Sequence, residues 1–232
     1  METGWPDAIL ETTHWSKLTV KESSEDERRA AYAYFYDRYR GVVYRYFRRG
    51  GLSRDEAADL VQAFYATALG RTFLERADPK RGRFRDYLRK AAGRFLVDYW
   101  RRPRPRTLSL EGLIEKDAWG KFEPVSESEA PDEEFDRDWA RAILEAAIRA
   151  AAARYEKRGR SDDFRAFLLR THEGRSSREI GAALGIPEGR VDNICSRARA
   201  RVAREIRREV AATVQGPGEV EEEIRRLLEL LE

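Results

Sequence analysis

The segment 176–208 constrains the fold most, because it combines a helix start, a turn and a second helix in one continuous stretch. Ser176 and Glu179 have the spacing of a capping box, which predicts a helix over 177–184. Gly185 can adopt the positive φ of a tight turn at no steric cost. The helix that follows keeps apolar side chains on one side and arginines at i+3 and i+4 spacing on another, namely Arg190, Arg197, Arg201, Arg204 and Arg208. The segment therefore predicts a helix-turn-helix whose second helix presents guanidinium groups.

The first turns of that second helix are the strongest candidate for a contact with nucleic acid. Guanidinium groups on such a helix can reach phosphates and the edges of guanine in a major groove. Asp192 disfavours a phosphate contact but could accept a hydrogen bond from cytosine. The alternative interpretation is a solvated arginine face on a purely structural helix.

Charge along the chain is strongly segregated, although the net charge is only +3. Residues 76–106 hold twelve basic and three acidic side chains, and residues 190–208 hold seven basic and two acidic ones. Residues 107–136 hold ten acidic and two basic side chains, and residues 209–232 hold seven acidic and two basic ones. This asymmetry predicts two surfaces that face nucleic acid, separated by an acidic connector.

Composition excludes several classes of protein. No apolar run approaches the ~18–20 residues of a membrane span, and the N-terminus lacks the order of a signal peptide. The single cysteine, Cys195, excludes an internal disulfide and a cysteine cluster for zinc, and His14 and His172 lie far apart. We therefore expect a cytoplasmic, reduced chain without a metal or a cofactor. No stretch shows period-two alternation, so nearly all of the secondary structure should be helical.

Helical periodicity and breaker residues divide the chain into five parts. They are an N-terminal segment (1–25), a first helical domain (26–106), an acidic linker (107–136), a second helical domain with the helix-turn-helix (137–215) and a C-terminal amphipathic helix (216–232). Besides the two helices above, we expect helices over Asp26–Arg49, Ser53–Leu69 with a capping box to Glu56, Phe84–Arg101, Arg137–Lys157, Phe164–Thr171 and Glu219–Leu231. In the third of these helices we expect Phe95 and Trp100 to belong to the core.

Two further motifs make the chain resemble one family. DEAADLVQAFY (Asp55 to Tyr65) and FRDYLRKAAGRFLVDYWRR (Phe84 to Arg102) resemble regions 2.2 and 2.3–2.4 of bacterial sigma factors of the extracytoplasmic-function class. The helix-turn-helix resembles region 4 of that family. The resemblance covers residues 30–106 and 138–208, in the family's order. It implies an all-α protein of two small helical domains, joined by an extended acidic linker that threads through the polymerase active-site cleft.

The resemblance also implies a function and partners. The chain would be an alternative sigma factor that binds core RNA polymerase, recognises promoter DNA and helps to melt it, without being an enzyme. The clamp helices of the largest polymerase subunit would bind Asp59, Leu60, Gln62 and Tyr65. An anti-sigma or other regulatory protein is a further partner that the resemblance permits.

Two groups of DNA-contacting residues follow from the same resemblance. The group that captures and melts the −10 element would be Arg83, Phe84, Arg85, Tyr87, Arg89, Arg94, Tyr99, Arg101 and Arg102. The group that recognises the −35 element would be Arg190, Asp192, Asn193, Ser196, Arg197 and Arg201. The chain departs from the family by Tyr87 where tryptophan is common and by Arg94 where asparagine is common, which puts the promoter sequence in doubt.

Two other functions remain as alternatives. A helix-turn-helix regulator could bind DNA without polymerase, and it would not need the Asp55–Tyr65 motif or the acidic linker. An enzyme could collect a divalent metal on Asp59, Asp86 and Asp98, but these carboxylates lie among arginines and no nucleophile–base pair or phosphate loop accompanies them.

The C-terminal helix carries a continuous apolar stripe, which is unfavourable in water. We expect it to turn back at Gly216 and to cap the helix-turn-helix domain, with its glutamates near the arginines of residues 191–208. Binding of the stripe to a partner protein is the alternative.

Overall fold

The computed structural model describes residues 24–69, 83–101, 129–214 and 216–232. Within these residues all regular structure is helical, so the expected all-α class is confirmed. The predicted N-terminal segment and acidic linker lie mostly outside the described residues, as does Arg102. None of the described helices is both long enough and apolar enough to cross a bilayer.

Eight helices form in the described part of the chain. They are α2 (Glu25–Arg49), α3 (Arg54–Leu69), α5 (Phe84–Arg101), α7 (Glu129–Glu156), α8 (Ser161–Glu173), α9 (Ser177–Leu184), α10 (Glu188–Ala211) and α11 (Pro217–Glu229). Two of them, α5 and α9, have the bounds that the sequence predicted. The capping box from Ser53 to Glu56 forms at the start of α3, and Gly51 adopts a φ of 88° after α2.

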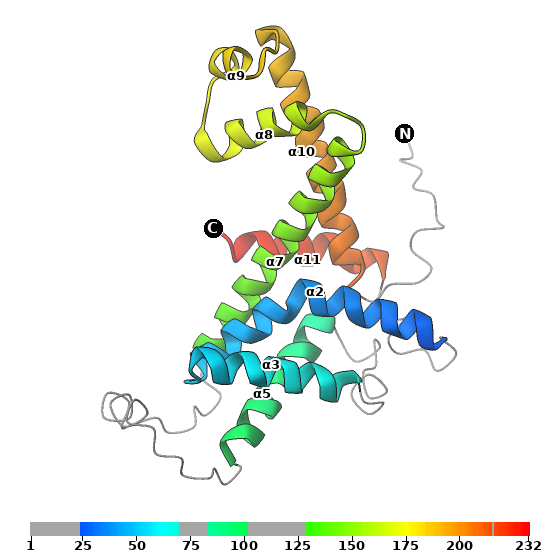
Figure 1. The fold of residues 1–232 in the computed structure, drawn as a ribbon, viewed down its shortest axis with the longest axis vertical. Helices are drawn as coiled ribbons and strands as arrows, with labels where there is room; N and C mark the ends of the chain where they lie inside the picture. The colour runs from blue at the N-terminus through cyan, green and yellow to red at the C-terminus, as the bar shows by residue number, and fades with distance from the viewer. Residues whose placement is uncertain (1–23, 70–82, 102–128, 215) are drawn as a thin grey trace.

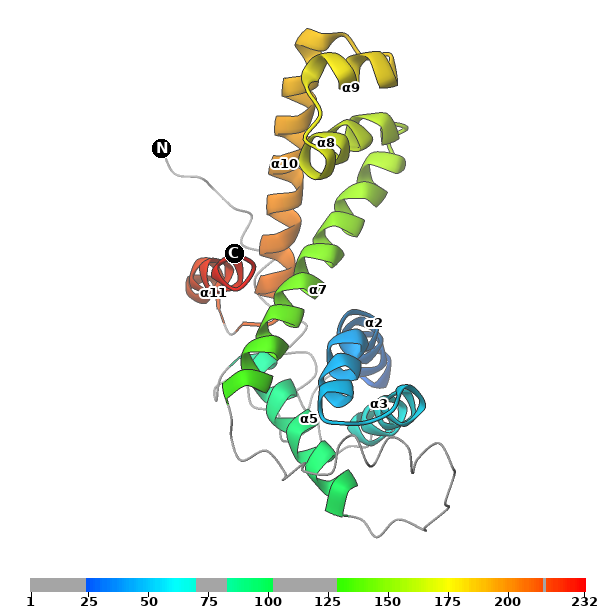
Figure 2. The same cartoon turned by 90° about the vertical axis from the view of Figure 1, so that its left-hand side faces the viewer.

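The helices are arranged around one long antiparallel pair, α7 and α10, which runs along the length of the molecule (Figures 1 and 2). Helices α8 and α9 pack at one end of this pair, whereas α2, α3 and α5 lie at the other end. Helix α11 crosses the pair near the end of α10 (Figure 2). The start of α7 therefore belongs to one end of the molecule and its last turns belong to the other.

Aromatic side chains form the core around α2. Tyr39 is fully buried and stacks on Trp139 of α7 with ring centroids 3.9 Å apart and planes 9° apart. Phe84 of α5 packs against Phe35 at 4.1 Å between centroids. Because Phe135 also lies in this core, the first two turns of α7 join the helices of the N-terminal half.

The predicted end of the acidic linker at residue 136 is wrong, because α7 begins at Glu129. Pro131 and the acidic residues after it favoured a loop interpretation, but both are also compatible with a first helical turn. Proline needs no amide donor there, and carboxylates interact favourably with the positive end of the helix dipole. Burial of Phe135 and Trp139 against α2 then stabilises this extra helix.

The predicted position of the C-terminal helix is only partly confirmed. Helix α11 does fold back onto α10, where Glu221 pairs with Arg207 at 2.8 Å. However, its buried residues Val220 and Leu227 join the aromatic core of the N-terminal half, not the two clusters of the helix-turn-helix end. It therefore lies where the two halves meet and does not cap the helix-turn-helix domain.

Candidate nucleic-acid interface

Helices α9 and α10 form the predicted helix-turn-helix. Ser176 and Glu179 make the reciprocal capping box, and their hydrogen bonds lower the pKa of Glu179. Gly185 ends α9 with a φ of 66°, which favours glycine. Gly181 was not singled out from the sequence, yet a Cβ there would lie 2.6 Å from the carbonyl oxygen of Ile186. The close approach of α9 to the turn therefore requires glycine at a second position.

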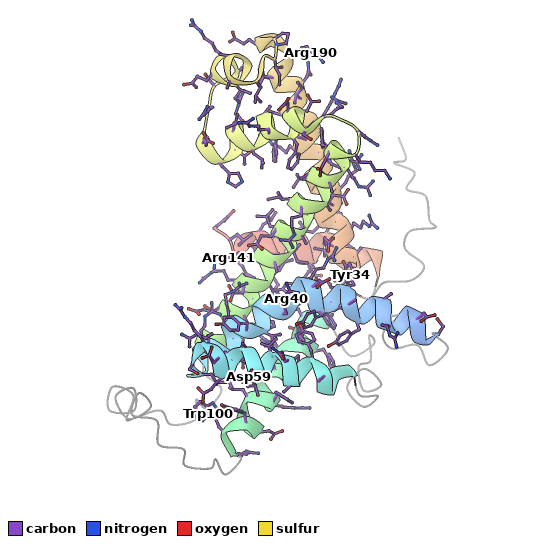
Figure 3. All side chains as sticks on the ribbon, viewed as in Figure 1. Tyr34, Arg40, Asp59, Trp100, Arg141 and Arg190 are labelled. Atoms are coloured by element: carbon purple, nitrogen blue, oxygen red, sulfur yellow. The ribbon has the colours of Figure 1, made fainter. Side chains whose placement is uncertain are left out.

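The start of α10 presents a cationic surface at the far end of the molecule (Figure 3). Arg190, Asn193, Ser196 and Arg197 are exposed, whereas the apolar residues between them are buried against α8 and α9. Within the described part of the chain, no carboxylate pairs with the side chain of Arg190 or Arg197. These guanidinium groups are therefore free to meet phosphates or base edges.

Asp192 is exposed, but one of its two carboxylate oxygens already has partners inside the motif. Its carboxylate accepts hydrogen bonds from Ser177 at 2.8 Å and from Arg170 at 3.1 Å. These bonds fasten the first turn of α10 to α9 and α8. Asp192 thus orients the start of α10, and this tertiary arrangement was not visible in the sequence.

Arg201 belongs to a separate cluster around Glu205, which is buried. Arg154 of α7 lies 2.8 Å from that carboxylate, Arg201 lies 3.7 Å from it and Arg208 lies 4.0 Å from it. Burial chiefly, and then the charge of Arg204, lowers the pKa of Arg201. The single carboxylate of Glu205 pairs with several guanidinium groups, so this part of α10 keeps an excess of positive charge. Arg154 escaped the sequence analysis because only the packing of α7 brings it here.

The predicted polymerase-facing residues of α3 divide into two exposed and two buried ones. Asp59, labelled in Figure 3, and Gln62 are exposed, whereas Leu60 and Tyr65 are buried. Tyr65 packs edge-on against Tyr36 at 4.9 Å, and burial raises its pKa. In this structure only Asp59 and Gln62 of the four can therefore touch a partner.

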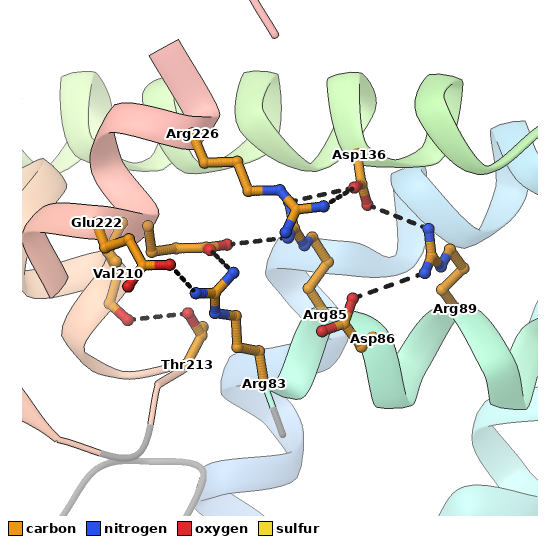
Figure 4. A network of polar contacts seen from close by, with 10 residues as sticks. Arg83, Arg85, Asp86, Arg89, Asp136, Val210, Thr213, Glu222 and Arg226 are labelled. Atoms are coloured by element: carbon orange, nitrogen blue, oxygen red, sulfur yellow. Dashed lines mark hydrogen bonds and ion pairs between the residues drawn. The ribbon is translucent and has the colours of Figure 1, made fainter. Parts of the chain in front are cut away.

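The first turns of α5 are covered, which corrects the prediction that they are open to DNA. Phe84 is buried in the aromatic core, and Arg85 is 1% exposed. Arg83 and Arg85 form ion pairs with Glu223 of α11, and Arg89 lies 3.9 Å from Asp136 of α7 (Figure 4). The sequence could not show this, because it does not reveal that α11 and the start of α7 lie over α5.

The last turns of α5 are open. Arg94 and Arg101 are exposed, and Trp100, which the sequence placed in the core, is 47% exposed. Tyr87 and Tyr99 are half-buried, and the Tyr99 hydroxyl donates a hydrogen bond to Glu56 at 3.1 Å. Phe95 does pack against the core, edge-on to Phe64. An exposed indole on a helix end that also carries arginines can stack on a base while the guanidinium groups hold phosphates.

No metal-binding group of side chains accompanies these surfaces in the described part of the chain. No three histidine, cysteine or carboxylate side chains there come close enough together to hold a metal ion. Comparison with known proteins adds no assignment, since no family model, curated protein or solved structure matches the chain.

Proposed function

We propose that the chain is an alternative sigma factor that binds core RNA polymerase, recognises promoter DNA and helps to open it. The observation that carries the proposal is the capped helix-turn-helix of α9 and α10, whose exposed Arg190, Asn193 and Arg197 face away from the core. A helix presented in this way fits a major groove and can read its bases. The −35 element would be its target.

The open end of α5 supports a second DNA contact. Trp100 supplies an exposed aromatic plane, and Arg94 and Arg101 supply phosphate contacts beside it. Stacking on such a plane stabilises an unpaired base by about 1–3 kcal/mol, which helps to hold melted DNA open. The −10 element would be the target of this end. Phe84 is excluded by its burial in the aromatic core, and Arg83 and Arg85 are excluded while α11 covers them.

The exposed face of α3 supports a polymerase contact. Asp59 and Gln62 lie on it with Ala63 and Ala66 beside them, so a carboxylate and an amide are presented next to small apolar side chains. Such a mixed face suits a protein partner better than it suits nucleic acid. The sequence resemblance names the clamp helices of the largest polymerase subunit as that partner.

A pull-down with purified core RNA polymerase tests the proposal. The wild type and the variant Glu229→Arg, which reverses an exposed charge on α11, should be retained on the polymerase. Asp59→Arg combined with Gln62→Ala should abolish retention while helicity by circular dichroism stays unchanged. Equal retention of the folded double variant, or no retention of the wild type, would refute a sigma-factor role for this face.

A DNA-binding regulator that acts without polymerase is the second candidate, and the burial of Leu60 and Tyr65 favours it. Both candidates require that Arg197→Ala weaken duplex DNA binding more than Arg199→Ala does. Arg199 is also exposed on α10, but it projects from the opposite side of the helix. If Arg197 reads a guanine, its loss should cost about 1–3 kcal/mol and relax the preference for that base.

A further inference from the structure

Two arginines at the start of α5 pair with carboxylates of α11. Arg83 and Arg85 form what we name the α5 arginine face. Arg83 contacts Glu222 at 3.0 Å and Glu223 at 2.9 Å, both on the first turns of α11. Figure 4 shows these contacts as one network that links α5, α7 and α11.

The centre of this network is buried but poorly hydrogen-bonded. Arg85 and Glu223 are each 1% exposed, and their closest charged atoms are 3.5 Å apart. Arg85 also lies 3.4 Å from Asp136, yet its three side-chain nitrogens make no hydrogen bond within the described residues. Burial raises the pKa of both Asp136 and Glu223. The attraction within a buried ion pair offsets the cost of desolvating its charges only when its geometry is good. The contacts of Arg85 are long and lack hydrogen bonds, so they offset only part of that cost.

Helix α11 has the charge pattern of a short polyanion. Four carboxylates fall within five residues of its first turns, at Glu219, Glu221, Glu222 and Glu223. Guanidinium groups bind carboxylates and phosphates through the same planar array of donors. The carboxylates of α11 and the phosphates of a nucleic-acid strand can therefore occupy the α5 arginine face only in turn.

We propose that α11 is an internal competitor of nucleic acid: it occupies the α5 arginine face and keeps single-stranded DNA off it until α11 is displaced. This inference rests on the DNA-binding part of the proposed function, but it does not require RNA polymerase. The covered face and the open end belong to the same helix but lie on different sides of it, because Arg85 and Arg94 are separated by about two and a half turns. Displacement of α11 would add up to two cationic positions, Arg83 and Arg85.

The affinity of the full-length chain for a fluorescent single-stranded oligonucleotide tests the proposal, with anisotropy measured over a series of salt concentrations. Glu222→Gln with Glu223→Gln removes two charges and keeps the side-chain shape. It should bind on the order of tenfold more tightly at low salt. For single strands the slope of log affinity against log salt changes by about 0.7 for each phosphate contact, so the slope should steepen by about 1.4 when both arginines engage.

The matched control is Glu221→Gln, which removes one charge from the same turn but frees Arg207 on the other side of α11. It should leave the slope nearly unchanged. Glu222→Gln alone alters a side chain that is 69% exposed, so it tests the same contact in a variant whose folding is not at risk. It should give an intermediate gain.

Adding Arg83→Gln to the double variant Glu222→Gln, Glu223→Gln should remove most of its gain in affinity for the oligonucleotide, because Arg83 pairs with both glutamates. A gain that survives Arg83→Gln, or that Glu221→Gln reproduces, would show a general charge effect and overturn the proposal. Unchanged affinity and slope in Glu222→Gln would also overturn it. If the wild type fails to bind polymerase but the variants show the expected gain in affinity for the oligonucleotide, only the polymerase part of the proposed function is refuted.

Discussion

Glu209 joins the end of α10 to α2, and its loss should destabilise the protein measurably. The side chain is 4% exposed. It accepts hydrogen bonds from Arg38 Nε at 2.6 Å, from Arg38 Nη2 at 2.8 Å and from the Tyr34 hydroxyl at 2.8 Å. Burial, followed by the nearby Glu209 carboxylate, raises the pKa of Tyr34, so its hydroxyl keeps the proton that it donates. The perturbation that we consider is Glu209→Gln.

The size of the effect follows from these contacts. A hydrogen bond to a charged group contributes about 1.5–3 kcal/mol, and removal of one partner of a buried ion pair costs about 3–5 kcal/mol. Glutamine keeps the volume and one acceptor oxygen, and Arg38 is 25% exposed, so water can solvate the freed guanidinium group. We therefore expect Glu209→Gln to lower the free energy of unfolding by about 2–3 kcal/mol, less than the full loss of a buried pair. Tyr34→Phe removes one donor and should cost about 1–2 kcal/mol.

Urea unfolding followed by circular dichroism measures both changes, and the double variant measures their coupling. Because the two side chains share one carboxylate, the double variant should lose less than the sum by at least about 0.5 kcal/mol. Glu221→Gln is the control, since Glu221 is 62% exposed in its pair with Arg207. It should change the free energy of unfolding by less than about 0.5 kcal/mol. If Glu209→Gln is as mild as this control, the buried contact is not what holds α10 to α2.

Three further predictions concern packing and ionisation. Gly181→Ala places a Cβ 2.6 Å from a backbone oxygen of the turn, so it should cost about 1–3 kcal/mol in urea unfolding, whereas Gly189→Ala, with open space around it, should not destabilise. Equal effects of the two substitutions would contradict the close approach of α9 to the turn. Trp139→Ala removes the fully buried indole between α7 and α2 and should cost about 3–5 kcal/mol, and a loss below about 1 kcal/mol would contradict this packing. Burial raises the pKa of Tyr32 to about 12. The folded state therefore holds a proton that the unfolded state releases near pH 10, so stability should fall as the pH rises above about 10, and a flat stability profile by circular dichroism would disagree.

Local sequence signals predicted several helix ends correctly. The capping boxes at Ser53 and Ser176 and the positive φ of Gly185 all form. Each of these features depends on hydrogen bonds or backbone angles within a few residues, so a short stretch of sequence contains the required information.

The first turns of α7 could not be predicted from local sequence alone. Pro131 and its acidic neighbours are compatible both with a linker and with the first turn of a helix. Trp139 and Phe135 select the helix, because they bury against α2, which lies about a hundred residues earlier in the chain. Gly181 is a similar case, since the close approach that requires it exists only after α9 and the turn have packed together.

The sequence by itself determined which residues form helices and where cationic side chains are concentrated, because periodicity and capping are local. It could not determine which of those side chains reach solvent. Arg85 and Arg94 belong to the same helix and have the same chemistry, yet Arg85 is buried and Arg94 is exposed. The two side chains lie on opposite sides of α5, and Asp136 of α7 and Glu223 of α11 cover the side of Arg85. Helical periodicity indicates on which side of a helix a residue lies, but only tertiary packing decides what covers that side.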